Sequence, residues 1–309
     1  PYRRVNALSF DDMGLVKIFT LPSQHVTPIL FCLNVYECSM AESEFWKGTI
    51  DTGPVPETDS SYDCIVVGGG PGGSAAASYL AMQGKSVLLL EKGIWPRDKI
   101  CGDAVGGKSL SHVSALGVKT RLEATPHFRV TGIVFSSPNG SEVTVPLPEE
   151  DVARLEAGYS LPREQFDWLL FERATELVRK NGGSVVQGAT VTEVFESDQK
   201  ITGVQVRIGG KRGEVLHFHA PWTIGAGGDR CPVAKKIVKE MNGGDLIEKM
   251  HYCGGYREYW SGVKGCEGDA GNIEIHFVDG IIPGYFWLFP IGGGKVNVGS
   301  GLVFGLMNK

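Results

Sequence analysis

One glycine-rich turn constrains this chain more than any other feature, because it joins a strand-like segment to a run of small residues. The apolar segment Asp63–Val67 runs into the turn Gly68–Gly73, and the small-residue run Ser74–Met82 follows until Gly84 ends it. Ser86–Glu91 then has the composition of a second buried strand. This order of strand, turn, helix and strand predicts a dinucleotide-binding βαβ unit.

Each glycine of the turn has its own predicted task. Gly68 allows a tight turn, Gly70 removes the side chain that would keep the backbone away from a pyrophosphate, and Gly73 lets the helix approach the sheet. Pro71 and Gly72 occupy the first helical turn, whose free N–H groups and partial positive charge attract phosphate. An ordinary α/β unit with a glycine-rich turn remains the alternative interpretation.

The acidic end of the second strand indicates which nucleotide the site accepts. Glu91 follows the strand, where its carboxylate can accept hydrogen bonds from a ribose 2′-hydroxyl and would repel a 2′-phosphate. Ile291–Lys295 is also rich in glycine, but it lies between two strand-like segments and predicts a hairpin turn. With a single fingerprint, we expect no separate nicotinamide domain of the disulfide-reductase type.

Composition excludes several classes of protein. The chain has 309 residues, 42% of them apolar, and a net charge of −5, which argues against nucleic-acid binding. Its seven cysteines form no CxxC pair, so we expect no disulfide framework, no zinc site and a reducing, cytoplasmic location. His217 and His219 share a strand face without a third ligand, which predicts no metal there. The longest early apolar run, Ile29–Leu33, is too short to span a membrane.

Residues 1–60 differ from the remainder of the chain. They lack a sustained period, and Asp51–Ser61 has the polarity of a linker. We expect residues 1–60 to be a poorly ordered or non-native extension and linker, with Met40 as a natural start. Mass spectrometry of the native N-terminus tests this hypothesis.

Several further elements are predicted by pattern. Arg129–Phe135 and Glu142–Leu147 alternate like strands around Pro138-Asn139-Gly140, which predicts a hairpin. A helix is expected from Ser160 as N-cap to Asn181. The expected fold class is α/β, in which a Rossmann-like domain with a mostly parallel sheet is interleaved with a mainly antiparallel sheet domain. The expected domains are residues 62–125 with 160–242, and residues 126–159 with 243–309.

Motifs spread over most of residues 62–301 share one order. They are the fingerprint with Glu91-Lys92, the loop Pro96–Asp103, the helix start Leu161–Asp167, and the stretches Pro283–Pro290 and Val296–Gly301. This order resembles the geranylgeranyl reductase family, within the FAD-dependent superfamily of aromatic-hydroxylase-type flavoproteins. The Tyr-x-Trp-x-Phe-Pro stretch that begins at Tyr285 discriminates best for that family.

The resemblance implies a set of site residues. Those expected to bind FAD are Gly68, Gly70, Pro71, Gly72, Gly73, Glu91, Lys92, Arg97, Cys101, Gly102, Asp103, Arg163, Gly227 and Asp229. Those expected to bind substrate are Tyr285, Trp287, Phe289 and Pro290, with Cys101 and Tyr285 as catalytic proton donors.

The residues themselves leave other roles open for several of these positions. A free cysteine such as Cys101 is often a packed small residue. Arg163 has the spacing of a surface pair with Asp167. Tyr285, Trp287 and Phe289 alternate on one strand face, where they either fill a core or line a cavity for an apolar chain.

The chain departs from the family pattern in two places. Gly227 stands where the superfamily has an acidic residue, and Asp229 is displaced by two positions. The chain ends at Lys309 before the family's Gly-Asp motif, so we expect a C-terminally truncated fragment.

The resemblance implies an FAD-dependent reductase that saturates isoprenoid double bonds of a lipid or pigment precursor. Protonation of the alkene and hydride transfer from flavin N5 would together reduce each bond. An external donor, NADPH or a ferredoxin-type protein, would supply electrons, and a lipid substrate implies peripheral contact with a membrane surface. The sequence indicates neither the donor nor an oligomeric state.

Two alternatives remain open from the sequence. One is a flavin monooxygenase or halogenase of the same fold. The other is a non-enzymatic FAD-binding remnant, suggested by Gly227 and the missing C-terminal motif.

Overall fold

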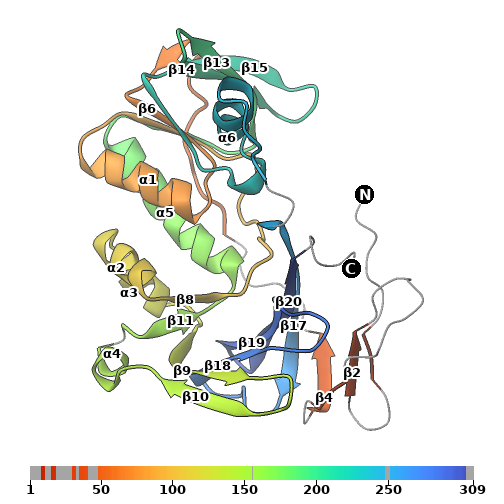
Figure 1. Ribbon diagram of the computed structural model, residues 1–309. Coiled ribbons are helices and arrows are strands. Elements are labelled where there is room, and N and C mark those ends of the chain that lie inside the picture. The colour runs from red at the N-terminus through yellow and green to blue at the C-terminus, as the bar shows by residue number, and fades with distance from the viewer. Residues whose placement is uncertain are drawn as a thin grey trace.

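The computed structural model describes residues 48–154, 156–247 and 251–303, and the backbone of four short strands nearer the N-terminus. Those four strands are β1 (Leu8–Phe10), β2 (Leu15–Ile18), β3 (Leu30–Cys32) and β4 (Val35–Met40). Helices packed on a parallel sheet form one part of the described chain, and a large mixed sheet forms another (Figure 1).

The parallel sheet contains the predicted βαβ unit. Its order is β12-β7-β6-β16, and every neighbouring pair is parallel. The strands are β6 (Cys64–Val67), β7 (Val87–Leu90), β12 (Ser184–Val186) and β16 (Trp222–Gly225). All residues of β6 and β7 are buried, as their unbroken apolar runs require for strands covered on both faces. The Rossmann-like α/β prediction is therefore confirmed.

Two helices lie side by side on this sheet (Figure 1). They are α1 (Pro71–Met82) and α5 (Arg163–Lys180). Gly84 adopts a φ of +75° just after α1, as expected of the residue that ends it. The predicted N-cap of α5 is wrong, because Pro162 holds the cap position and Ser160 is fully buried in strand β11. Pairing of β11 with its neighbours outweighs the local capping preference of serine.

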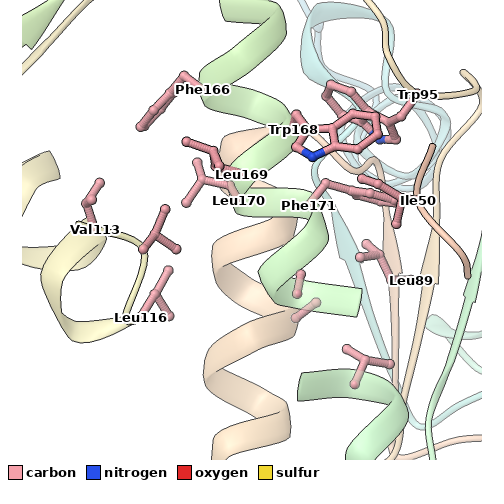
Figure 2. Packing of buried hydrophobic residues seen from close by; sticks show 14 of the residues in the cluster. Ile50, Leu89, Trp95, Val113, Leu116, Phe166, Trp168, Leu169, Leu170 and Phe171 are labelled. Carbon is pink, nitrogen blue, oxygen red and sulfur yellow. The ribbon is translucent and has the colours of Figure 1, made fainter. Parts of the chain in front are cut away.

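Helix α5 contributes large side chains to the core on two of its sides (Figure 2). Leu169 and Leu170 point toward Val113 and Leu116, near the end of helix α2 (Lys108–Ala115). Phe171 lies on the other side against Trp95, with ring centroids 5.4 Å apart. The same Phe171 ring lies so close to Gly69 that a Cβ there would come within 2.5 Å of it. The core side chain Phe171 thus packs directly against the backbone of the glycine turn at Gly69.

We expect Phe171→Ala to destabilise the folded chain by about 3–5 kcal/mol, because the ring is fully buried and its removal leaves a cavity under the turn. Urea unfolding monitored by circular dichroism measures this change. Val143→Ala, at a position 57% exposed, is the matched control and should cost less than about 0.5 kcal/mol. Equal costs for the two variants would contradict the packing argument.

The large sheet has nine strands and is mainly antiparallel, as predicted. Its order is β4-β17-β20-β19-β18-β9-β11-β8, with β10 pairing β9. Only β18 and β9 run parallel among its described pairs. The strands not yet bounded are β8 (Ala104–Gly106), β9 (Phe128–Ser136), β10 (Glu142–Pro146), β11 (Gly158–Ser160), β17 (Cys253–Val263), β18 (Ala270–His276), β19 (Tyr285–Gly292) and β20 (Lys295–Val303).

Both predicted hairpins are present in this sheet. β9 and β10 pair antiparallel around Asn139-Gly140, and Gly140 has a φ of +82°. β19 and β20 pair around Gly292–Gly294, each with positive φ, so this second glycine-rich segment is a turn between strands.

A further sheet has the order β13-β14-β15-β5. Its strands are β5 (Ser60–Ser61), β13 (Ala189–Ser197), β14 (Lys200–Ile208) and β15 (Glu214–His219). The remaining helices are α3 (Lys119–Glu123), α4 (Glu149–Ala153), α6 (Pro232–Lys235), the 3-10 turn η1 (Gly228–Arg230) and the π-helix η2 (Lys236–Met241).

The expected extension and linker contain two described strands that pair with later parts of the chain. Ser60–Ser61, inside the expected linker, pairs with β15, and β4 pairs antiparallel with β17. These segments form strands by pairing with distant parts of the chain, although their local composition does not favour a strand. Most of residues 1–47 lies outside the described residues, and the native start stays a prediction. β8 lies within residues 62–125 but pairs in the large sheet, so the chain crosses between the two parts there.

Candidate functional site

The glycine turn between β6 and α1 has the geometry its sequence predicts. Gly68 has a φ of +112°, and a Cβ there would come within 2.4 Å of the Ala226 carbonyl oxygen. A Cβ on Gly73 would come within 1.7 Å of the Gly68 carbonyl oxygen. These two glycines are therefore required by the protein's own backbone.

Gly70 and Gly72 are free of such contacts. A Cβ on Gly72 would meet nothing within 4 Å, and one on Gly70 would meet only the Arg97 guanidinium, at 3.7 Å. Gly70 holds the N-cap position of α1 and Pro71 its first turn, and no side chain caps this helix end. The open space at Gly70 and Gly72 is thus a cradle at a positive helix end, which fits a pyrophosphate.

Glu91 points into this turn rather than away from it. The Gly69 N–H donates to Glu91 Oε2 at 2.7 Å, and the Gly93 N–H donates to Oε1 at 2.8 Å. Arg97 Nη2 lies 3.2 Å from Oε2, and the carboxylate is 4% exposed. Within the described residues, Glu91 therefore joins the turn to the segment after β7 and directly follows that strand, as the sequence predicts.

The basic residues near Glu91 differ in their surroundings. The Arg97 guanidinium lies 4.2 Å from the centroid of the Trp95 ring, a cation–π contact that holds it at the rim of the cradle. Lys92 is exposed.

The second glycine turn lies against the first. β16 runs parallel to β6, and the Ala226 N–H donates to the Val67 carbonyl at 2.8 Å. A Cβ on Gly68 would come within 2.7 Å of the Gly227 nitrogen, so Gly227 borders the cradle. Asp229 is exposed in η1, one turn farther on.

The loop that contains Cys101 and Gly102 lies on the large sheet. A Cβ on Gly102 would come within 2.7 Å of the Phe289 ring. Asn297 Nδ2 donates to the Cys101 carbonyl at 3.0 Å, and Asn297 Oδ1 accepts from Trp287 Nε1 at 2.8 Å. The sheet strands β19 and β20 thus fix the backbone of this loop, and Cys101 itself is half-buried.

Arg163 and Asp167 form the i,i+4 pair that their spacing allows, but not on the surface. Arg163 Nε and Nη2 donate to the two oxygens of Asp167 at 2.6 and 2.8 Å, and the Asp167 side chain is 1% exposed. Although burial acts to lower it, the Asp167 carboxylate raises the pKa of the Arg163 guanidinium above its ordinary value, and Cys101 adds to this effect. Arg163 therefore lies beside the Cys101 loop with its charge already paired.

We expect Asp167→Ala to lower the free energy of unfolding by about 3–5 kcal/mol, because it leaves the Arg163 guanidinium without its bidentate partner. Thermal unfolding measures this loss. Asp51→Ala removes an exposed carboxylate from Arg179 and is the control, with an expected cost below about 1 kcal/mol. If Asp167→Ala lowered the free energy of unfolding no more than Asp51→Ala does, this assignment would be wrong.

The aromatic residues of β19 divide between surface and core. Trp287 and Phe289 are buried in a cluster with Phe128, Val130 and Ile273. Tyr285 is 40% exposed, and its ring centroid lies 6.0 Å from that of Trp287. Pro290 is buried on the same strand. The described chain thus brings Phe289 and Trp287 to the Cys101 loop and leaves Tyr285 at the strand's outer end.

Sequence reasoning missed Asn297, Arg257 and Tyr259. Arg257 Nη2 donates to both Asp98 oxygens at 2.6 and 2.8 Å, and its guanidinium lies 4.2 Å from the Tyr259 ring centroid. A fully buried asparagine inside the apolar alternation Val296-Asn297-Val298 was a signal that could have been used, since buried polar groups need partners.

Comparisons with known proteins agree with this geometry. Residues 61–262 match the family model described as FAD binding domain. Menaquinone reductase of Mycobacterium tuberculosis is 29% identical over 79% of this chain and 55% of its own length. Digeranylgeranylglycerophospholipid reductase 1 of Methanococcoides burtonii is 31% identical over 78% of this chain and 54% of its own length. The chain thus spans about half the length of these relatives.

A solved structure shares the fold. A geranylgeranyl bacteriochlorophyll reductase-like protein from Thermoplasma acidophilum superposes with a TM-score of 0.60 at 24% identity, over 80% of this chain and 57% of that one. Among the described residues, no helix is long and apolar enough to cross a membrane.

Proposed function

We propose, on the premise that this chain belongs to the FAD binding domain family, that the protein is an FAD-dependent oxidoreductase that saturates isoprenoid double bonds. The observation that carries the proposal is the open cradle at Gly70 and Gly72, beside a buried Glu91 at the end of β7. The named activities of the relatives, reduction of menaquinone and of digeranylgeranylglycerophospholipids, support an isoprenoid substrate.

The residues that would hold the pyrophosphate and ribose of FAD follow the ends of β6, β7 and β16 in the parallel sheet. The cradle at α1 would receive the pyrophosphate, with Arg97 and Gly227 at its border, and Glu91 would accept hydrogen bonds from the ribose. We assign this task to residues 62–125 and 160–242, and the substrate to the large sheet. Bound FAD would supply hydride-transfer chemistry.

The chain's own residues would supply the proton and the surroundings of the alkene. An isolated alkene accepts hydride poorly until it is protonated, so a proton donor is needed near the reacting carbon. The Cys101 thiol, on a loop fixed by Asn297 and Phe289, is our first candidate, and the exposed Tyr285 hydroxyl is the second. The rings of Trp287 and Phe289 would stabilise positive charge that develops beside the loop.

The finer parts of the proposal concern substrate and partners. We propose a lipid or pigment precursor with a geranylgeranyl-type chain, an external electron donor, and peripheral contact with a membrane. NADPH and a ferredoxin-type protein are the donors to compare.

The test is an assay of the protein expressed from its complete gene. The purified protein should carry FAD, and with reductant it should add hydrogen to a geranylgeranyl lipid, which product mass spectrometry detects. Oxygen in the product, with peroxide released in the presence of substrate, would instead favour a monooxygenase. A colourless protein that cannot be reconstituted with FAD would refute both.

A further inference from the structure

Asp103, the last residue of the loop before β8, has a carboxyl group with no exposed surface. We propose that Asp103 is a positioning residue that fixes the Cys101–Gly102 loop between helix α5 and strands β17 and β20. The importance of this positioning role for catalysis rests on the function proposed above. Its geometry does not, because it involves only contacts within the chain.

Asp103 binds the start of α5 through its backbone and its side chain. The Arg163 N–H donates to Asp103 Oδ1 at 3.1 Å, and the Leu161 N–H donates to the Asp103 carbonyl at 3.1 Å. Because α5 begins at Arg163, the carboxylate also lies at the positive end of that helix. One residue therefore joins the loop to a long, rigid element.

Two strands of the large sheet meet the same carboxyl group. The Tyr259 hydroxyl of β17 and the Asn297 amide of β20 lie against it, and Arg257 of β17 attracts its charge. The same Asn297 holds the Cys101 carbonyl. Asp103 and Cys101 are thus bound by a shared partner, so displacement of one is transmitted to the other.

The opposite end of the loop is held by the same strand. Arg257, with 5% of its side chain exposed, forms its ion pair with Asp98. The loop from Asp98 to Asp103 is therefore attached to β17 by the ion pair at Asp98, and Arg257 and Tyr259 of the same strand face its other end at Asp103. Between these ends lies Cys101, the thiol proposed to face substrate.

The charge of Asp103 is sensitive to mild acid. Burial raises the pKa of its carboxyl group to about 6, against the opposing effects of Asn297, Tyr259, Arg257 and the Arg163 N–H. Among the described residues, no other group has a resolved effect on the pKa of this carboxyl. As pH falls through about 6 the carboxyl becomes neutral and its attraction to Arg257 is lost. Because this carboxyl has a higher pKa in its buried position than in water, protonation favours that position, and the hold on the loop should strengthen as the pH falls through about 6.

The experiment measures the reactivity of Cys101 in the whole chain, without substrate. A pyridyl disulfide, which reacts with thiols at acidic pH, is added, and the modified cysteines are identified by peptide mass spectrometry. The exposed Cys253 serves as the internal reference, and the buried Cys64 and Cys231 report global unfolding. Asp103→Asn keeps an acceptor oxygen for Arg163 but removes the charge, whereas Asp103→Ala removes both.

We expect Asp103→Ala to raise the rate at Cys101, relative to Cys253, by about tenfold, the change in local opening that one lost buried hydrogen bond produces. Asp103→Asn should give a smaller increase and should lose the fall in the Cys101 rate, relative to Cys253, that the wild type shows below about pH 6. Glu123→Gln removes the charge of the carboxylate that accepts the Tyr159 hydroxyl, and it is the matched control, expected to match the wild type.

Two results would overturn the inference. One is a Cys101 rate within about twofold of the wild type in Asp103→Ala while Cys64 and Cys231 stay protected. The other is an increase at all cysteines together, which would make Asp103 a general stabilising residue. Because the measurement needs neither FAD nor substrate, its outcome is independent of whether the proposed reductase activity is found.

Discussion

Gly70→Val should weaken FAD binding by at least about 100-fold, or roughly 2.7 kcal/mol, while the chain stays folded. A Cβ at Gly70 would meet only the far end of Arg97, at 3.7 Å, so the free protein has room for the side chain. The same side chain would occupy the space that the pyrophosphate needs at the positive end of α1. Flavin fluorescence titration measures the affinity, and circular dichroism checks the fold.

Two further glycine variants make this experiment decisive. Gly73→Ala should prevent folding rather than binding, because its Cβ would come within 1.7 Å of the Gly68 carbonyl oxygen. Gly255→Ala, on β17 with ordinary spacing of 3.7 Å to the nearest atom, should change neither property. Wild-type FAD affinity in folded Gly70→Val would show that the nucleotide does not bind at this turn.

Glu91→Ala is expected to destabilise the chain by about 3–5 kcal/mol and to lower its melting temperature by about 10 °C. The carboxylate is buried and accepts from the Gly69 and Gly93 N–H groups, so alanine leaves two buried donors and the Arg97 charge without their partner. The glycine turn should lose its shape, and FAD affinity should fall with it.

Glu91→Gln separates the two roles of this residue. The amide keeps one oxygen as an acceptor for a backbone N–H but cannot pair with Arg97, so we expect an intermediate loss of stability. Differential scanning calorimetry measures the melting temperatures of both variants. Glu57→Ala, in the segment before β5, is the exposed control. A melting temperature of Glu91→Ala equal to that of the control would contradict the contacts described here.

The local parts of the fold could be read from the sequence with good accuracy. The βαβ unit and both hairpins depend on residues close together in the chain, where apolar runs and glycine positions decide the backbone path. The prediction failed where distant strands decided the outcome. Ser160 has the chemistry of an N-cap, yet it lies in β11, and Ser60–Ser61 became a strand by pairing with β15.

The candidate site divides in the same way. The tasks predicted for Gly68 and Gly73 follow from the tight turn itself, and the structure bears out their geometry. Arg163 was expected either to lie near the cofactor or to pair with Asp167 on the helix surface, and the pair with Asp167 forms in the interior rather than on the surface. The contact of Asn297 with Cys101 joins residues 196 positions apart, a distance over which no local pattern carries information.

By itself, the amino-acid sequence determined the nucleotide-binding turn, since a φ of +112° at Gly68 and the absence of room at Gly73 are demands that only glycine satisfies. Tertiary structure alone decided how the Cys101 loop is held. Its partners come from α5, β17 and β20, and they become neighbours only after the large sheet has formed beside the helices. Burial then gives Asp103 and Asn297 their importance, because a polar group without access to water must be matched by another group of the protein.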